Sequence, residues 1–131
     1  MTNDELMARF ETGDLAAESF HHYHHVQLAF AYLSNLAVLP ALQGFTDALK
    51  RYASVRGTSV LYHETITFAY FFLIRERMAR APGLDWDTFV EANSDLLQWK
   101  PGILDRYYRG STLQVDLARA VFLFPDKIAE L

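Results

Sequence analysis

The residues with the clearest chemical potential are five histidines, four of which fall within five consecutive positions. His21, His22, His24 and His25 form this cluster, and His63 stands alone further along the chain. A neutral imidazole can ligate a metal ion, and an imidazole can also transfer a proton near neutral pH. The direction in which each ring points therefore decides what the cluster can do.

A helical wheel separates the four clustered histidines. At about 100° per residue, His22 and His25 share the apolar face that continues through Ala29. His24 points to the opposite, solvated side, and His21 lies at the edge of the apolar face. The wheel predicts that His22 and His25 face the core.

A second wheel places His63 on the buried face of a later helix, together with Thr67 and Tyr70. If three successive helices run up, down and up, the first and third of them are parallel. His22, His25 and His63 all lie near the starts of those two parallel helices. We therefore expect the three rings at the same end of the molecule.

Three neutral imidazoles that converge in an apolar interior form the geometry of a transition-metal site. Nitrogen and oxygen ligands fit iron or zinc first, and also manganese, nickel or copper. The sequence thus predicts a metal-dependent enzyme acting on a small molecule, with metal ligands His22, His25 and His63. Glu64 would act as fourth ligand or as catalytic general base, and Glu18 is the alternative for completing the site. Hydrolytic, lyase and oxidative chemistry all stay open.

Other polar side chains are candidates for binding the substrate. Tyr70 and Thr67 share the face of His63, and Tyr32 lies on the helix of the histidine cluster. Arg106 could clamp a carboxylate with two hydrogen bonds, although a surface ion pair with Asp95 is the simpler interpretation.

Two other classes of function use the same residues differently. In the first, the three histidines serve a metal-free module that binds a small molecule or performs acid/base catalysis. In the second, the protein is a non-enzymatic, dimeric interaction protein, and the histidines are core residues bonded to backbone carbonyls. The stretches Tyr70-Phe71-Phe72 and Phe122-Leu123-Phe124 would then form the contact surface.

The elements that must position these side chains are all helical. Capping residues, prolines and glycines mark helix ends, and the predicted helices are 2–12, 18 or 19 to 35 or 36, 40–56, 59 or 61 to 81, 85–92, 101–108 and 111–124. A short turn is expected at 95–99. No alternating pattern is long enough for a strand. The prediction is a compact all-α bundle, a single domain over 1–131, with three long helices and several short C-terminal ones.

Composition narrows the classes of protein. Hydrophobic residues make up 51% of the chain, enough for one core, and the net charge of −4 argues against nucleic-acid binding. The absence of cysteine excludes disulfides and thiolate metal sites. The acidic start is unlike a signal peptide, and the longest apolar stretches are too short to span a membrane. We expect a cytoplasmic protein whose partner is a small molecule rather than nucleic acid or a membrane, and a homodimer is compatible with this.

Two motifs resemble those of a group of small, uncharacterised bacterial proteins that are all-helical and of similar length. One is the pattern FxHxxHxxLAxxYL, which begins at Phe20, and the other is YHETIT, which begins at Tyr62. The resemblance extends to the C-terminal part of the chain. It implies that His22, His25, His63 and Glu64 are the functional positions, and it implies no particular reaction.

Overall fold

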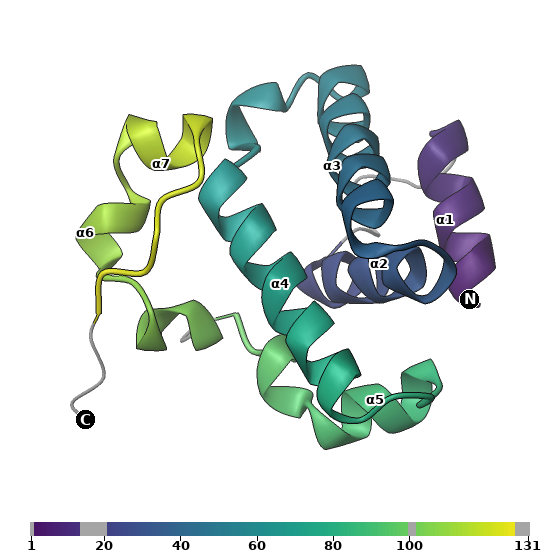
Figure 1. Cartoon of the computed structure of the whole chain (residues 1–131). Coiled ribbons are helices and arrows are strands. Elements are labelled where there is room, and N and C mark those ends of the chain that lie inside the picture. The colour runs from purple at the N-terminus through teal and green to yellow at the C-terminus, as the bar shows by residue number, and fades with distance from the viewer. Residues whose placement is uncertain (1, 14–20, 100–101, 128–131) are drawn as a thin grey trace.

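The computed structural model describes residues 2–13, 21–99 and 102–127, and in these ranges the chain is mostly helical, with no β-strand. The α-helices, drawn in Figure 1, are α1 Asn3–Thr12, α2 His22–Asn35, α3 Val38–Val55, α4 Glu64–Arg80, α5 Trp86–Ala92, α6 Gly110–Leu113 and α7 Asp116–Ala120. Short 3₁₀ helices are η2 Ser59–Leu61, η3 Ser94–Leu97 and η4 Ile103–Arg106. The all-α prediction is confirmed for the part of the chain described.

Several helix ends lie where the capping residues predict them. The Thr2 hydroxyl accepts the Glu5 N–H at 3.1 Å before α1, and Gly13 ends that helix with a φ of 76°. Before α5, the Asp85 carboxylate accepts the Thr88 N–H at 2.8 Å. These bonds satisfy backbone donors that a helix cannot satisfy internally.

Three predicted boundaries differ from the structure. α2 begins at His22, after an extended His21, and the predicted start at 18 or 19 lies outside the described residues. The helix expected to contain His63 is divided, because η2 precedes it and α4 begins only after His63. The helix expected from Ser111 to 124 is two short helices, because the backbone at Val115 is extended.

α2 is the central helix of the fold. Its residues 26–32 are buried on every side, because α1, α3, α4 and η3 all contact α2. The Phe30 ring packs against Trp86 and Phe89 of α5, with ring centroids 5.3 and 4.9 Å apart. The Trp86 indole also donates a hydrogen bond to the Tyr23 hydroxyl at 2.8 Å, which ties α5 to the start of α2.

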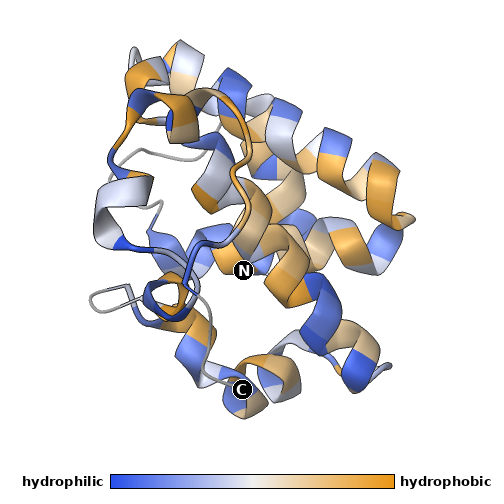
Figure 2. Cartoon of the chain, turned by 60° about the vertical axis from the view of Figure 1, so that its left-hand side comes forward, coloured by the Kyte–Doolittle hydropathy of each residue, from blue (hydrophilic) through white to orange (hydrophobic). Residues whose placement is uncertain are grey.

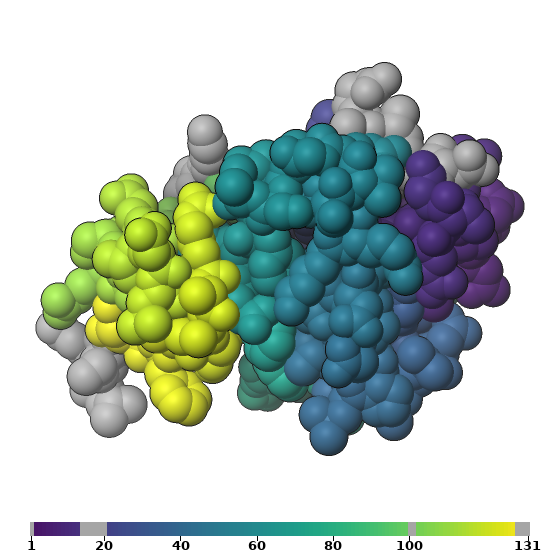
Figure 3. Space-filling model, turned by 90° about the horizontal axis from the view of Figure 1, so that it is seen from above, coloured from purple at the N-terminus to yellow at the C-terminus, as the bar shows by residue number. Residues whose placement is uncertain are grey.

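The C-terminal part of the chain is held against α4 by partly buried hydrogen bonds. The Thr65 hydroxyl donates to the Val121 carbonyl at 2.9 Å and accepts the Leu123 N–H at 3.1 Å. The Tyr108 hydroxyl donates to the Leu123 carbonyl at 2.7 Å. The segment 121–124 is hydrophobic along its length (Figure 2), and Figure 3 shows the yellow C-terminal part against the teal segment. These contacts place α7, which carries Arg119, beside the start of α4.

The two aromatic stretches differ in exposure. Tyr70 and Phe71 are buried, and Phe72 is 43% exposed, whereas Phe124 is 82% exposed. The first stretch therefore belongs mainly to the core of the protein. Within the described residues, no helix combines the length and the apolar character needed to cross a membrane.

Candidate functional site

A pocket of about 540 Å³ lies between α2, α3 and α4, with contributions from two segments nearer the C-terminus. Its wall is largely apolar and aromatic, with a few polar side chains. The lining residues are His22, His25, Val26, Ala29, Phe45, Leu49, Tyr52, Ala53, Thr58, Leu61, Tyr62, His63, Ile66, Thr67, Tyr70, Ile74, Trp99 and Arg119. The three histidines predicted to converge do line one pocket.

His22 occupies the first position of α2 and makes one defining hydrogen bond. Its Nε2 lies 2.8 Å from the Leu96 carbonyl oxygen, so Nε2 carries a proton and donates. The ring meets Tyr70 edge to face at 4.7 Å between centroids and lies 4.9 Å from Trp99. Burial lowers the pKa of His22, while the bond to Leu96 opposes that shift.

His63 is the residue that caps α4 rather than a member of the helix. Its Nδ1 accepts the Ile66 N–H at 3.1 Å, and its Nε2 donates to the Leu113 carbonyl at 2.7 Å. Both ring nitrogens are therefore committed to backbone groups, and these bonds fix a neutral tautomer. The side chain joins the start of α4 to the end of α6.

His25 lies one turn after His22 on α2, and its surroundings keep the imidazole neutral. Burial is the main cause that lowers its pKa to about 3, and the charges that His22 and His24 would carry act in the same direction. At neutral pH the imidazole is therefore uncharged. His22 and His25 thus contribute uncharged imidazoles to the pocket wall.

The predicted metal centre is wrong. Among the described residues, no group of three histidine, aspartate or glutamate side chains is placed so that it could hold a metal ion. His63 has no ring nitrogen left to ligate a metal, and the Nε2 of His22 is bonded to Leu96. Glu18, the alternative ligand, lies outside the described residues. The arrangement corresponds to histidines bonded to backbone carbonyls, which the sequence left as an alternative.

Glu64, the predicted fourth ligand or general base, does not line the pocket itself. Its carboxylate accepts a hydrogen bond from the Tyr62 hydroxyl at 2.6 Å, and the Lys50 ammonium lies 3.9 Å away. Tyr62 does line the pocket. Burial and the bond to Glu64 raise the pKa of Tyr62, so its phenol stays protonated at neutral pH.

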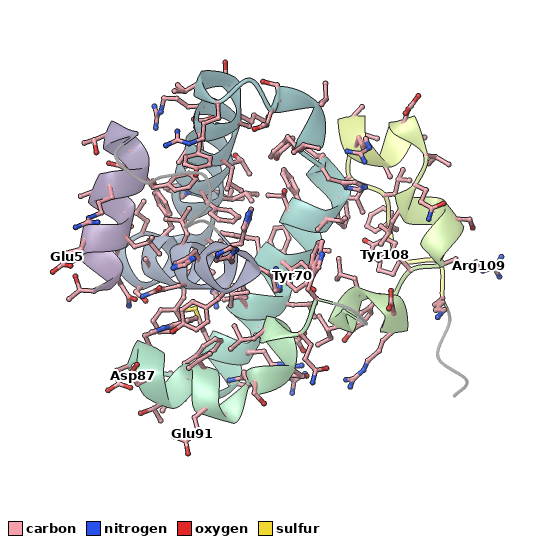
Figure 4. All side chains as sticks on the ribbon, turned by 180° about the vertical axis from the view of Figure 1, so that it is seen from behind. Glu5, Tyr70, Asp87, Glu91, Tyr108 and Arg109 are labelled. Carbon is pink, nitrogen blue, oxygen red and sulfur yellow. The ribbon has the colours of Figure 1, made fainter. Side chains whose placement is uncertain are left out.

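The four residues predicted to bind substrate divide into two pairs. Tyr70 and Thr67 line the pocket, and burial raises the pKa of Tyr70 to about 12. Figure 4 shows Tyr70 in the middle of the molecule. Tyr32 is buried elsewhere and donates to Glu11 at 2.7 Å, and the exposed Arg106 lies 4.0 Å from Asp95. Neither Tyr32 nor Arg106 lines the pocket.

Sequence reasoning missed several residues of the pocket wall, including Trp99, Arg119 and Thr58. Thr58 and Trp99 belong to loops, where helical periodicity gives no information about direction. Arg119 belongs to α7, and the single helix predicted over 111–124 gives the wrong orientation because the chain there forms two short helices. Arg119 reaches the pocket because its Nη1 donates to the Val60 carbonyl at 3.1 Å, across 59 residues of sequence. A spacing pattern within one element could not have found it.

Comparisons with known proteins give no relative on which to base a function. No family model matches the chain, and neither a curated protein nor a solved structure matches it. The resemblance to the bacterial group stays a prediction. The geometry of the pocket is therefore the basis for any statement about function.

Proposed function

We propose that this protein binds a small molecule with an apolar body in the pocket between α2, α3 and α4. The observation that carries the proposal is the pocket itself, whose volume of about 540 Å³ lies within the roughly 300–1,000 Å³ typical of small-ligand sites. Phe45, Leu49 and Ile66 supply apolar wall, and His22 and Tyr70 place polar groups among it. Such walls bind by burial and orient by a few hydrogen bonds.

Most polar groups of the wall carry no charge. The imidazoles of His22 and His25 are held neutral, and the phenols of Tyr62 and Tyr70 stay protonated. Thr67 adds a hydroxyl. Because these groups are uncharged, entry of an apolar ligand costs little desolvation of charge. This favours binding driven by apolar contact.

The experiment is a titration with N-phenyl-1-naphthylamine, a neutral dye whose fluorescence rises in apolar surroundings. We expect saturable binding at one site in the wild-type protein. Ala53→Trp places a large side chain at the pocket wall and should weaken binding by about tenfold, which corresponds to about 1.4 kcal/mol. Ala53 is half-buried near the end of α3, so the fold should tolerate the change.

Ser54→Trp is the matched control. Ser54 is the next residue of α3, is exposed and does not line the pocket. It should bind the dye as the wild type does, and both variants should melt near the wild-type temperature. Absence of saturable binding to the wild type, or equal binding by Ala53→Trp, would overturn the proposal.

A further inference from the structure

The charges around the pocket are distributed unevenly. Among the described residues that line it, Arg119 alone carries a formal charge at neutral pH, and no aspartate, glutamate or lysine is present. Burial keeps the pKa values of His22 and His25 low, so these rings are neutral. A chain with a net charge of −4 thus presents a single positive charge to its pocket.

Arg119 is held at the rim of the pocket rather than inside it. The side chain is exposed, and its Nη1 donates to the Val60 carbonyl at 3.1 Å, which keeps the guanidinium between α7 and η2. Thr58 and Leu61, on either side of Val60, line the pocket. Arg119 forms no ion pair with any described carboxylate, and a guanidinium has five N–H donors in all.

Glu64, an acidic residue next to the pocket residues Tyr62 and His63, is already compensated. Glu64 does not line the pocket, but its carboxylate accepts a hydrogen bond at 2.6 Å from the hydroxyl of Tyr62, which does. The Lys50 ammonium lies 3.9 Å from the Glu64 carboxylate and 5.2 Å from the centre of the Tyr62 ring. The negative charge of Glu64 therefore sits beside a positive one and does not offset Arg119.

We propose that the ligand is an apolar monocarboxylate, whose body fills the pocket and whose carboxylate binds Arg119 at the rim. This inference rests on the proposed function. A planar guanidinium matches a carboxylate with two parallel hydrogen bonds, and one cation calls for one anionic group. The apolar wall formed by Phe45, Leu49 and Ile66 would be a poor match for a second charge.

The experiment measures displacement of N-phenyl-1-naphthylamine by two competitors of nearly the same shape, naphthalene-2-carboxylate and naphthalene-2-carboxamide. The preference is the Kd of the amide divided by the Kd of the carboxylate. We expect a preference above one for the wild type. Because the ion pair is partly exposed, Arg119→Gln should lower the preference by about two- to fivefold.

Two further variants separate charge from fold. Arg109→Gln removes the same charge from the C-terminal part of the chain, but Arg109 does not line the pocket and projects away from Tyr70 (Figure 4). It should leave the preference unchanged. Arg119→Lys keeps the charge but loses the two-bond geometry, so its preference should lie between those of the wild type and Arg119→Gln.

The outcomes distinguish this inference from the proposed function. If the dye and the amide bind and Ala53→Trp weakens both, but the carboxylate is not preferred, only the inference is overturned. The inference is also overturned if Arg119→Gln and Arg109→Gln lower the preference equally. If neither the dye nor either competitor binds the wild type, both proposals fail.

Discussion

The two ends of α4 use polar side chains in different ways. At its start, neutral groups bind the backbone of later segments, as His63 does with Leu113 and Thr65 with Val121. Near its end, Arg77 binds the Asp95 carboxylate through two hydrogen bonds of 2.9 and 3.0 Å. Both arrangements attach a later segment to the helix, but only the first includes a residue, His63, that lines the pocket between α2, α3 and α4.

The difference shows what each kind of contact allows. The Arg77 guanidinium also donates to the Asn93 side chain at 2.9 Å, so Arg77, Asn93 and Asp95 form one hydrogen-bonded network. The backbone bonds at the other end fix the positions of segments and leave space between their side chains. A neutral wall around a space suits an apolar ligand, whereas the bonds between Arg77 and Asp95 attach η3 to α4.

The largest expected effect concerns the cap of α4. Replacing His63 with alanine removes the cap and leaves the half-buried Leu113 carbonyl without its donor, at a combined cost of about 2–3 kcal/mol in the free energy of unfolding. His63→Asn preserves a good capping group, so it should cost about 1 kcal/mol less. Urea denaturation measures both. Equal losses in the two variants would show that capping contributes nothing.

The sequence predicts the convergence of His22, His25 and His63 because that convergence follows from local rules. Helical periodicity predicts which face of its helix each histidine occupies. When three successive helices reverse direction in turn, the first residues of the first and third helices lie at the same end of the molecule. What the rings bind does not follow from these rules. The partners of His22 and His63 lie 74 and 50 residues away, at Leu96 and Leu113. Those distant carbonyls determine that the rings form hydrogen bonds rather than a metal site.

The sequence also does not predict that His63 is the N-cap of α4. Histidine is not among the residues that favour helix N-caps, so the sequence predicts a start of α4 that is too early. Thr2 and Asp85 are preferred caps, and their helices were bounded correctly. The sequence therefore predicts helix ends well where the capping chemistry is common and poorly where a tertiary contact selects an unusual cap.

The second prediction concerns acid stability at the pocket. The pKa of His25 is about 3 in the folded protein and about 6.5 when unfolded, so below pH 6.5 the unfolded chain binds more protons. Stability should therefore fall as the pH drops from 6.5 toward 3, by about 2 kcal/mol between pH 7 and pH 5. The Arg77–Asp95 pair should not contribute in this window. It lowers the pKa of Asp95, so its contribution is complete above about pH 4 and is lost only as the pH falls below that.

Urea denaturation at a series of pH values measures this slope in the wild type and in His25→Gln, whose side chain does not titrate. The variant should lose most of the dependence between pH 7 and pH 5. His24→Gln is the matched control, because His24 lies on the same turn of α2 but does not line the pocket. It should change the slope less. An unchanged slope in His25→Gln would mean that folding does not lower the pKa of His25.

The smallest expected effect concerns the ionic end of α4. Arg77→Met keeps the apolar stem of the side chain but removes the two bonds to Asp95 and the one to Asn93, at a cost of about 1 kcal/mol because the ion pair is partly exposed. This cost should shrink in about 1 M salt, where the Debye length falls to about 3 Å and charge interactions are strongly screened. The cost of His63→Ala should not change. Arg80→Met is the control, since its pair with Glu76 is more exposed and should contribute less than about 0.5 kcal/mol. If salt affects the His63 and Arg77 variants alike, the two ends of α4 do not differ in the way proposed, and charge contributes to both.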